Sequence, residues 1–427
     1  MMQTDIHPDL ALELVLEQAR SSRTDTMIVP VEKAAGKCLA VPAHSLVDQP
    51  PFAKSAMDGF AYNLLGRDAA AGDLPQFRIS ETVRAGFSRE APLEAGEAVP
   101  IMTGAPIPAG ADAVQRVEWT RREADKVVFT KRESINNIIA KGENCKAGDR
   151  VLSPRILSPQ DAGILAASGY RYITVYRPLK VAVLSTGDEL LEPSCTLPLE
   201  AIGPETRAKA TTEASKLLGT SSIFDSNGFQ LTSQAASCGA EVSYLGIFRD
   251  DIKTLTAAIG KALDETDIVI LSGGVSKGSF DFIPQVAHAL GIDGVFHGLL
   301  MKPGKPTFFG TKDGKALFGL PGNPVSTFVN FEVFIKPYLY ACAGIVYNPL
   351  VLACVLAKDV RRRETSRVEH IPAKIDFPDA VIAPLVYHGS SMITALGDAN
   401  ALLRLEIGVD TLQKGSTVYA RLIRPIH

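Results

Sequence analysis

Two acidic residues directly follow an apolar run near the middle of the chain. Residues 180–185, KVAVLS, have the composition of a buried strand, and Thr186, Gly187, Asp188 and Glu189 come next. Two carboxylates at a glycine turn can hold a hard divalent cation such as Mg²⁺, which prefers oxygen ligands and usually bridges to substrate phosphates. The same residues also suit a plain turn with an acidic helix start, which the helix dipole favours. The spacing alone leaves both interpretations open.

A second apolar run, DIVILS, ends in a glycine-rich loop, SGGVSKG, at residues 272–278, and Asp281 follows. Consecutive glycines let main-chain N–H groups approach an anion closely, and a following helix adds the positive end of its dipole. The loop has neither the Walker spacing nor the GxGxxG pattern, which disfavours an ATPase and a Rossmann oxidoreductase. A simple tight turn is the alternative.

Two further segments could bind anions. In residues 302–306, KPGKP, the prolines stiffen a loop that carries Lys302 and Lys305, so less ordering is needed when an oxyanion binds. Two lysines in a polar loop can equally be only solvated. In residues 321–326, PGNPVS, Pro324 suits the first position of a helix, whose start is a second potential anion site.

These four segments belong to a region in which strands and helices alternate, from about residue 178 to 340. The pattern predicts strands at KVAVLS, AEVSYLGIF, DIVILSGG and KALFGLPG, and helices at about 227–238, 253–264, 281–290 and 324–340. Such alternation is typical of a mostly parallel, doubly wound sheet covered on both faces. Ligands of these sheets gather at the carboxyl ends of the strands, so we expect the four segments to share one edge.

The rest of the chain predicts a multidomain α/β protein. A helix over residues 8–20 and a helix that begins near residue 158 belong to an N-terminal helical and extended domain, residues 1–45 plus 147–177. Short strands broken by Pro and Gly predict a β-rich inserted domain at 46–146. The α/β domain follows at 178–343, and a small, barrel-like C-terminal β domain at 344–427. The polar stretch 193–224 is long for a loop, and within it residues 205–219 predict a short surface helix that stops at Gly219.

Composition excludes several classes of protein. The chain has 427 residues, which suggests about three domains. No apolar run is long enough to cross a bilayer, and no export signal is visible at the start. The net charge of −3 argues against nucleic-acid binding. The six cysteines are scattered, without a CxxC pair, which favours a reducing cytoplasm over a disulfide framework.

Ten collinear motifs give the chain a resemblance to a known family. They are PPFAKSAMDGFAY, IMTGAPIPAGADAV, KGENCKAGD, STGDEL, FDSN, FRDD, LSGGVSKGSFDF, MKPGKP, GLPGNPVS and SSMITALGDANALL. Together they resemble the molybdopterin molybdenumtransferases, the MoeA proteins and the gephyrin E domain, over essentially the whole chain. This resemblance implies an enzyme that takes adenylyl-molybdopterin and molybdate, cleaves the adenylate in a Mg²⁺-dependent step, and yields molybdenum cofactor with AMP.

The resemblance also implies roles for individual residues. Catalytic residues would be Asp58 and Thr103 in the β-rich domain, and Asp188, Glu189, Asp225 and Asp250 in the α/β domain, with Asp188 and Glu189 at the metal. The pterin or its phosphates would lie at the glycine loop, and molybdate or the pyrophosphate link at the lysine segment. The implied binding residues are Ser272, Gly273, Gly274, Ser276, Gly278, Asp281, Lys302, Lys305, Pro321, Asn323, Ser326, Arg367 and Ser391.

Family members form elongated homodimers in which the cleft combines the α/β domain of one subunit with the β-rich domain of the other. The resemblance further implies transient contacts with the molybdopterin adenylyltransferase and with molybdoenzyme chaperones. The chain departs from the family pattern in two places. Asn144 stands where the family usually has an aspartate, and the polar stretch 193–224 is an atypical insertion that begins beside Asp188 and Glu189. They leave open a binding or scaffold paralogue that has lost turnover. Release of AMP from adenylyl-molybdopterin would distinguish the enzyme from that alternative.

Overall fold

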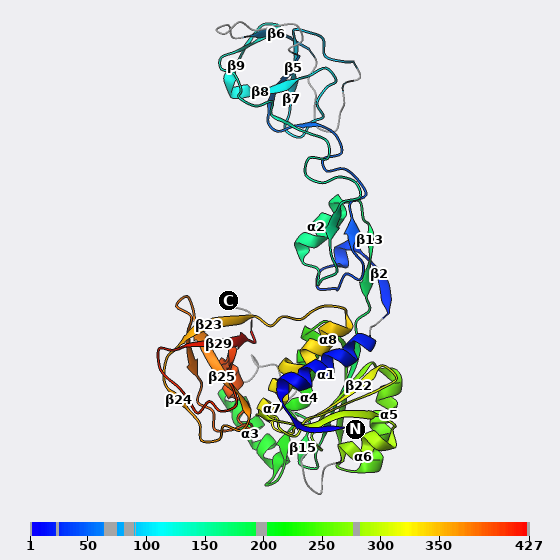
Figure 1. Ribbon diagram of the computed structural model, residues 1–427, viewed down its shortest axis with the longest axis vertical. Coiled ribbons are helices and arrows are strands. Elements are labelled where there is room, and N and C mark those ends of the chain that lie inside the picture. Colours follow the sequence, from blue (N-terminus) through cyan, green and yellow to red (C-terminus); the bar gives the residue numbers. More distant parts are fainter. Residues whose placement is uncertain are drawn as a thin grey trace. The chain divides into compact units, whose positions relative to one another are not determined.

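The computed structural model describes residues 2–22, 25–63, 75–80, 89, 91–193, 203–275 and 282–424. The chain divides into two compact units (Figure 1). One combines Met1–Met27 with Tyr176–His427, and the other is Ile28–Val175. No helix in the described part of the chain is both long enough and apolar enough to cross a membrane.

A seven-stranded sheet forms the centre of the first unit, in the order β1-β19-β21-β22-β18-β14-β17. The four predicted strands are confirmed as the mutually parallel group β22, β18, β14 and β17. The strands β1, β19 and β21 were not predicted, and β21 runs antiparallel to both of its neighbours. The strand bounds are β1 Gln3–Ile6, β14 Lys180–Thr186, β17 Glu241–Phe248, β18 Ile268–Ser272, β19 Asp293–Leu299, β21 Phe308–Lys312 and β22 Lys315–Leu320.

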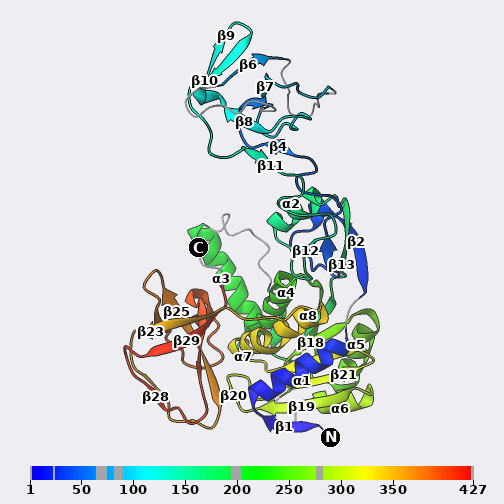
Figure 2. The same ribbon diagram turned by 45° about the horizontal axis from the view of Figure 1, so that its top comes forward.

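Helices cover both faces of this sheet, as the apolar strand sequences require. Because side chains alternate along a strand, Val181 and Val183 of β14 pack on one face with α1, α4, α7 and α8. Ala182 and Leu184 pack on the other face with α5 and α6 (Figure 2). The helices are α1 Pro8–Ser21, α4 Asn227–Ser237, α5 Ile252–Glu265, α6 Ile283–Ala289, α7 Pro324–Asn330 and α8 Lys336–Cys342; a π-helical turn, Phe331–Ile335, joins the last two.

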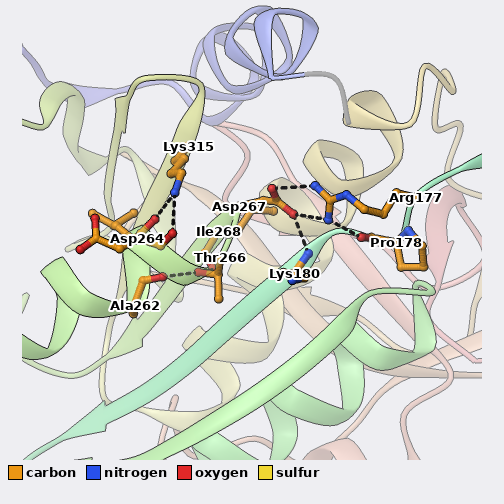
Figure 3. Close-up of polar contacts among 10 residues, drawn as sticks. Arg177, Pro178, Lys180, Ala262, Asp264, Thr266, Asp267, Ile268 and Lys315 are labelled. Atoms are coloured by element: carbon orange, nitrogen blue, oxygen red, sulfur yellow. Dashed lines mark hydrogen bonds and ion pairs between the residues drawn. The ribbon is translucent and has the colours of Figure 1, made fainter. Parts of the chain in front are cut away.

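Polar contacts fix the amino ends of three adjacent strands (Figure 3). Asp267, just before β18, accepts hydrogen bonds from Nη1 and Nη2 of Arg177, each at 3.0 Å, and from the N–H of Lys180 at 2.7 Å. At the start of β22, Lys315 Nζ donates to the carbonyl oxygens of Leu263 and Asp264 at the end of α5. An ammonium there complements the negative end of the helix dipole. The amino edge is therefore tied together by its own side chains.

The predicted insertion contains a helix, α3, Pro204–Leu218. It ends at Gly219, whose φ of 57° is the left-handed conformation that favours glycine, so this part of the prediction is confirmed. Residues 194–202 lie outside the described residues. The strand β15 (Leu190–Leu191), just before the insertion, pairs in parallel with β16 (Ile223–Phe224) at its end.

The end of the chain forms a small closed barrel within the first unit. The strand β25 pairs with both β26 and β27, and the ring closes through β23 and β29 around an apolar core. A short strand, β20, pairs with β25 and links the barrel to the α/β sequence. The bounds are β20 Met301–Lys302, β23 Val351–Leu356, β25 Val368–Asp376, β26 Val381–Pro384, β27 Ala401–Leu405 and β29 Thr417–Leu422.

The second unit is rich in β-structure, as predicted for residues 46–146. Its main sheet has the order β8-β5-β7-β6-β10-β9 and carries an apolar cluster on each face. The predicted helix near residue 158 is α2, Pro159–Ala167, which begins with a capping box between Ser158 and Asp161. The strands are β5 Gly59–Tyr62, β6 Gln76–Ile79, β7 Glu97–Ile101, β8 Ala113–Arg116, β9 Thr120–Glu123 and β10 Lys126–Phe129.

The four predicted domain boundaries stay predictions, but one grouping differs in the structure. Residues 1–45 were grouped with 147–177, whereas the first 27 residues lie in the unit of the α/β sheet. The reason is that β1 pairs with β19, and α1 packs its buried Ala11 and Val15 into the core of that sheet. The helix itself was predicted, but the sheet against which it packs could not be inferred from the sequence pattern.

Candidate active site

Predicted acids lie at neighbouring carboxyl ends of the sheet. Asp188 and Glu189 follow β14, and both are exposed. A Cβ atom on Gly187 would lie 2.7 Å from Oε2 of Glu189, so that carboxylate folds back over the turn into the space that a side chain at position 187 would occupy. Thr186 Oγ1 donates to Oδ1 of Asp250 at 2.6 Å, which joins the end of β14 to the loop after β17. The structure therefore brings these three acids to one edge.

Asp225 reaches the same edge from β16 but is buried, with 2% of its surface exposed. Its Oδ2 accepts a hydrogen bond from the hydroxyl of Tyr244 at 2.8 Å, and its Oδ1 accepts one from the N–H of Gly228 at 3.0 Å. Burial and this hydrogen bond to a carboxylate both raise the pKa of Tyr244, which keeps the phenol protonated as a donor. Asp225 is therefore fixed in orientation at the start of α4.

The glycine loop begins where β18 meets β14. Gly273 and Gly274 have φ values of 99° and 66°, and a Cβ on Gly273 would lie 2.2 Å from the carbonyl oxygen of Thr186. The side chain of Asn227, which was not predicted, donates to Ser272 Oγ at 2.8 Å and to the carbonyl of Gly322 at 2.6 Å. It thereby ties the ends of β18 and β22 together. The predicted residues Ser276, Gly278 and Asp281 lie outside the described residues.

Two buried polar atoms beside this loop have no hydrogen-bond partner among the described residues. They are the hydroxyl of Ser185 and Oδ1 of Asn227. Buried polar groups are normally satisfied by protein, water or ligand. The unused hydrogen-bonding capacity therefore fits an edge that receives a polar ligand.

A cavity of about 630 Å³ lies between the α/β sheet and the C-terminal barrel. Six of the predicted binding residues line it, from segments that are far apart in the sequence: Lys302, Lys305, Pro321, Asn323, Ser326 and Arg367. It is a pocket with three cationic side chains. A chain of negative net charge needs such a local concentration to hold an oxyanion.

Strand pairing explains how Lys302 comes to the pocket. In the parallel pair β20 and β25, Lys302 lies opposite Glu369, and its Nζ is 2.8 Å from Oε1 of that carboxylate. Oε2 of Glu369 lies 3.6 Å from Nη1 of Arg362, whose side chain is buried. Glu369 is thus held between two cations. Sequence spacing gave no sign of it, because 67 positions separate it from Lys302.

The other two cations also contact carboxylates. Lys305 Nζ lies 3.9 Å from Oδ1 of Asp5, and Arg367 donates to both oxygens of Glu364. This paired hydrogen bonding from Arg367 lowers the pKa of Glu364 to about 2, so its carboxylate is charged throughout the physiological range.

The C-terminal region also contributes Ser390, whose hydroxyl has a partner in the pocket. It accepts a hydrogen bond from Nδ2 of Asn323 at 2.8 Å, and Ser390 lines the cavity. The predicted residue, Ser391, is exposed beside it and does not line the cavity. A role for Ser391 stays a prediction, whereas Ser390 has the geometry of a pocket residue.

In the second unit, Asp58 and Thr103 form a pair. The strand β5 begins at Gly59 and lies opposite the end of β7 at Ile101, so the residues just outside both strands meet. Thr103 donates to Oδ1 of Asp58 from its N–H at 2.7 Å and from its hydroxyl at 3.0 Å. The N–H bond, followed by the hydroxyl bond, lowers the pKa of Asp58. The result is an exposed, ionised and oriented carboxylate. Asn144, the departure from the family pattern, is also exposed.

The acidic turn after β14 offers oxygen donors that a magnesium ion could use. Within the described residues no group of three or more His, Cys, Asp or Glu side chains lies close enough together to hold a metal ion. Asp188 and Glu189 offer two exposed carboxylates at one turn. Their oxygens suit Mg²⁺, which is commonly held by one or two carboxylates with substrate phosphates and water.

An open α/β sheet with a glycine loop at its carboxyl edge, next to a pocket of three cations, is an arrangement that suits small anionic ligands. Three family models match successive parts of the chain. They are the MoeA N-terminal region (domain I and II) over residues 6–169, the probable molybdopterin binding domain over 182–341, and the MoeA C-terminal region (domain IV) over 350–422.

Similarity to individual proteins extends over nearly the whole chain. A molybdopterin molybdenumtransferase of Staphylococcus aureus is 32% identical over 413 residues, which are 96% of this chain and 93% of the relative. One of Staphylococcus epidermidis is 31% identical over 397 residues, 91% of this chain and 89% of the relative. The crystal structure of a molybdopterin biosynthesis MoeA protein from Pyrococcus horikosii has a TM-score of 0.82 at 28% identity and covers 99% of this chain and 100% of that one. The chain belongs to the MoeA family.

Proposed function

We propose that the chain is a molybdopterin molybdenumtransferase that inserts molybdate into adenylyl-molybdopterin with Mg²⁺-dependent release of AMP. The observation that carries the proposal is the pocket in which Lys302, Lys305 and Arg367 meet, beside a sheet edge with a glycine loop and exposed acids. Membership of the MoeA family supports it, because relatives along the full chain bear that name.

Different residues of this site would bind the pterin, the metal ion and molybdate. Main-chain groups at Gly273 and Gly274, with Ser272, would receive the pterin or its phosphates, since glycines allow close approach. Asp188 and Glu189 would hold Mg²⁺, which when bound neutralises phosphate charge at the bond to be cleaved. Lys302, Lys305, Arg367 and Ser326 would hold molybdate, as fixed donors that require little ordering when the oxyanion binds.

Assembly and location form part of the proposal. We propose a homodimer in which the oriented carboxylate of Asp58 serves the site of the partner subunit. Contacts with the molybdopterin adenylyltransferase and with molybdoenzyme chaperones would deliver the substrate and receive the product. A reducing, cytoplasmic location is supported by Cys145, Cys238, Cys342 and Cys354, none of which forms a disulfide with another described residue.

The oxyanion assignment predicts a selective effect of the two lysines. Lys302→Ala and Lys305→Ala should each raise the molybdate concentration needed for half-maximal AMP release by roughly tenfold, while the adenylyl-molybdopterin requirement changes less. The reason is that molybdate depends on local positive charge, whereas the pterin has many other contacts. The difference between the variants and the wild type should depend on ionic strength, because salt screens partly exposed charges.

Steady-state rates over a molybdate series, at saturating adenylyl-molybdopterin, measure this effect. Lys374→Ala is a matched control, since this lysine lies on β25 with an exposed carboxylate neighbour, Asp376, and does not line the pocket. An unchanged molybdate dependence in both pocket variants would move these lysines to the pterin phosphate or to solvent.

A further inference from the structure

Every cation of the proposed oxyanion pocket contacts a carboxylate of the chain itself. The pairs are Lys302 with Glu369, Lys305 with Asp5, and Arg367 with Glu364. An oxyanion entering this pocket therefore meets charges that already have partners. Its affinity is the difference between the contacts it gains and the ion pairs it must weaken.

Of the three pairs, that of Arg367 and Glu364 most resembles the contact between a guanidinium and a bound oxyanion. Nε of Arg367 donates to Oε1 of Glu364 at 3.0 Å, and Nη2 donates to Oε2. Two parallel N–H groups of a guanidinium form the same fork that binds carboxylates and tetrahedral oxyanions. Glu364 thus occupies the Nε–Nη2 edge of Arg367, a donor pair that would also suit an oxyanion.

The main chain at Arg367 is fixed, whereas Glu364 is held by few contacts. Nη1 of the buried Arg362 donates to the carbonyl of Arg367 at 2.9 Å, which anchors that residue at the start of β25. The side chain of Glu364 is 44% exposed, lies in the loop before β25, and is held by Arg367 and by the hydroxyl of Ser366. The carboxylate can therefore leave while the main chain that carries Arg367 stays in place.

Glu369 differs from Glu364 in this respect. Its side chain is only 7% exposed and lies between Lys302 and Arg362, so removing it would leave the buried guanidinium of Arg362 without a carboxylate to neutralise its charge. It belongs to the permanent structure of the pocket. Glu364 is the carboxylate whose loss would leave the fold intact.

We propose that Glu364 is an internal substitute for the oxyanion: it occupies the guanidinium of Arg367 in the empty pocket and competes with the incoming anion. This inference rests on the proposed function, because it assigns Arg367 to oxyanion binding. Glu364 would therefore lower the affinity of the pocket for oxyanions. Glu364 would compete in the same way with abundant oxyanions such as sulfate. Only an anion that makes further contacts with the pocket would displace the carboxylate.

Direct binding to the purified full-length chain tests the proposal. Equilibrium dialysis against molybdate, with bound molybdenum quantified, gives the dissociation constant of molybdate. Adding sulfate as a competitor in the same experiment gives the dissociation constant of sulfate. Glu364→Gln should tighten molybdate binding by roughly three- to tenfold, as expected for the loss of a partly exposed competing charge. Sulfate should also compete at a lower concentration. Ser366→Ala, which removes the second contact of Glu364 without a change of charge, should act weakly in the same direction.

Two reference variants separate the possible outcomes. Glu123→Gln removes a carboxylate that is paired with an arginine, Arg121, in the other unit, and should leave molybdate binding unchanged. Arg367→Ala should weaken it. One outcome is that Arg367→Ala weakens molybdate binding while Glu364→Gln leaves it unchanged or also weakens it. Glu364 would then hold Arg367 in position instead of competing with the anion, and the proposal would be overturned. The assignment of the oxyanion pocket would be unaffected. If Arg367→Ala has no effect, the assignment of the pocket itself fails.

Discussion

Asp188→Ala and Glu189→Ala are each expected to lower the rate of AMP release by roughly a hundredfold or more. Both carboxylates are exposed at the carboxyl end of β14, where the chain offers two oxygen donors at one glycine turn. Removing either donor would weaken the hold on Mg²⁺ at the phosphates, so the charge that develops when the adenylate is cleaved would be less well neutralised. The loss should be partly relieved by raising the Mg²⁺ concentration.

The fold should be unaffected by these changes. Substitutions of exposed side chains outside a core usually alter the free energy of unfolding by less than about 0.5 kcal/mol. Glu241→Ala is a suitable control, because this exposed acid stands at the amino end of β17, on the opposite edge of the same sheet. Normal turnover of both variants at limiting Mg²⁺ would show that the two acids do not hold the metal.

The second large effect concerns assembly. Asp58→Ala and Glu189→Ala chains should each be inactive alone, yet co-expression should restore activity to up to half the wild-type value per heterodimer. In a two-fold symmetric dimer each cleft would combine one chain's α/β edge with its partner's Asp58. A mixed dimer then has one doubly damaged cleft and one intact cleft. The exposed, pre-oriented carboxylate of Asp58 is suited to act on a group outside its own unit.

Differently tagged chains and two successive affinity steps would isolate the heterodimer for assay. Asp58→Ala mixed with Asp58→Ala carrying the second tag is the control, since neither cleft of that dimer regains the carboxylate. Isolated heterodimers as inactive as their parents would mean that Asp58 serves the site of its own subunit.

The parallel core of the fold could be predicted because its strands are buried on both faces. The centres of KVAVLS and DIVILS are uninterrupted apolar runs, and a glycine follows each string within two residues, which marks the carboxyl end. The antiparallel part was missed, although one signal was present. Asp313 and Gly314 form the two-residue turn between β21 and β22, with φ values of 51° and 76°, and an Asp-Gly pair is a strong hairpin signal.

The site residues that belong to local sequence motifs could be predicted. Those that only tertiary contacts bring to the site could not. Asp188, Glu189 and the glycine loop follow directly from strand ends. Glu369 and the hydroxyl of Ser390, which line the pocket, were missed, and so was Glu364, which pairs with Arg367. These residues are brought together by the pairing of β20 with β25 and by loops of the C-terminal region. Pairings between such distant segments depend on packing, which periodicity and motif spacing do not encode.

The central claim is tested most directly by turnover of the purified wild-type chain. Adenylyl-molybdopterin, molybdate and Mg²⁺ are supplied together and then with each component left out in turn, while AMP and molybdenum cofactor are both quantified. We predict AMP and cofactor in equal amounts over many turnovers with all three present, and loss of both products when molybdate or Mg²⁺ is withheld. Tight binding of adenylyl-molybdopterin without any AMP release under the complete conditions would contradict the account and identify a binding paralogue that has lost turnover.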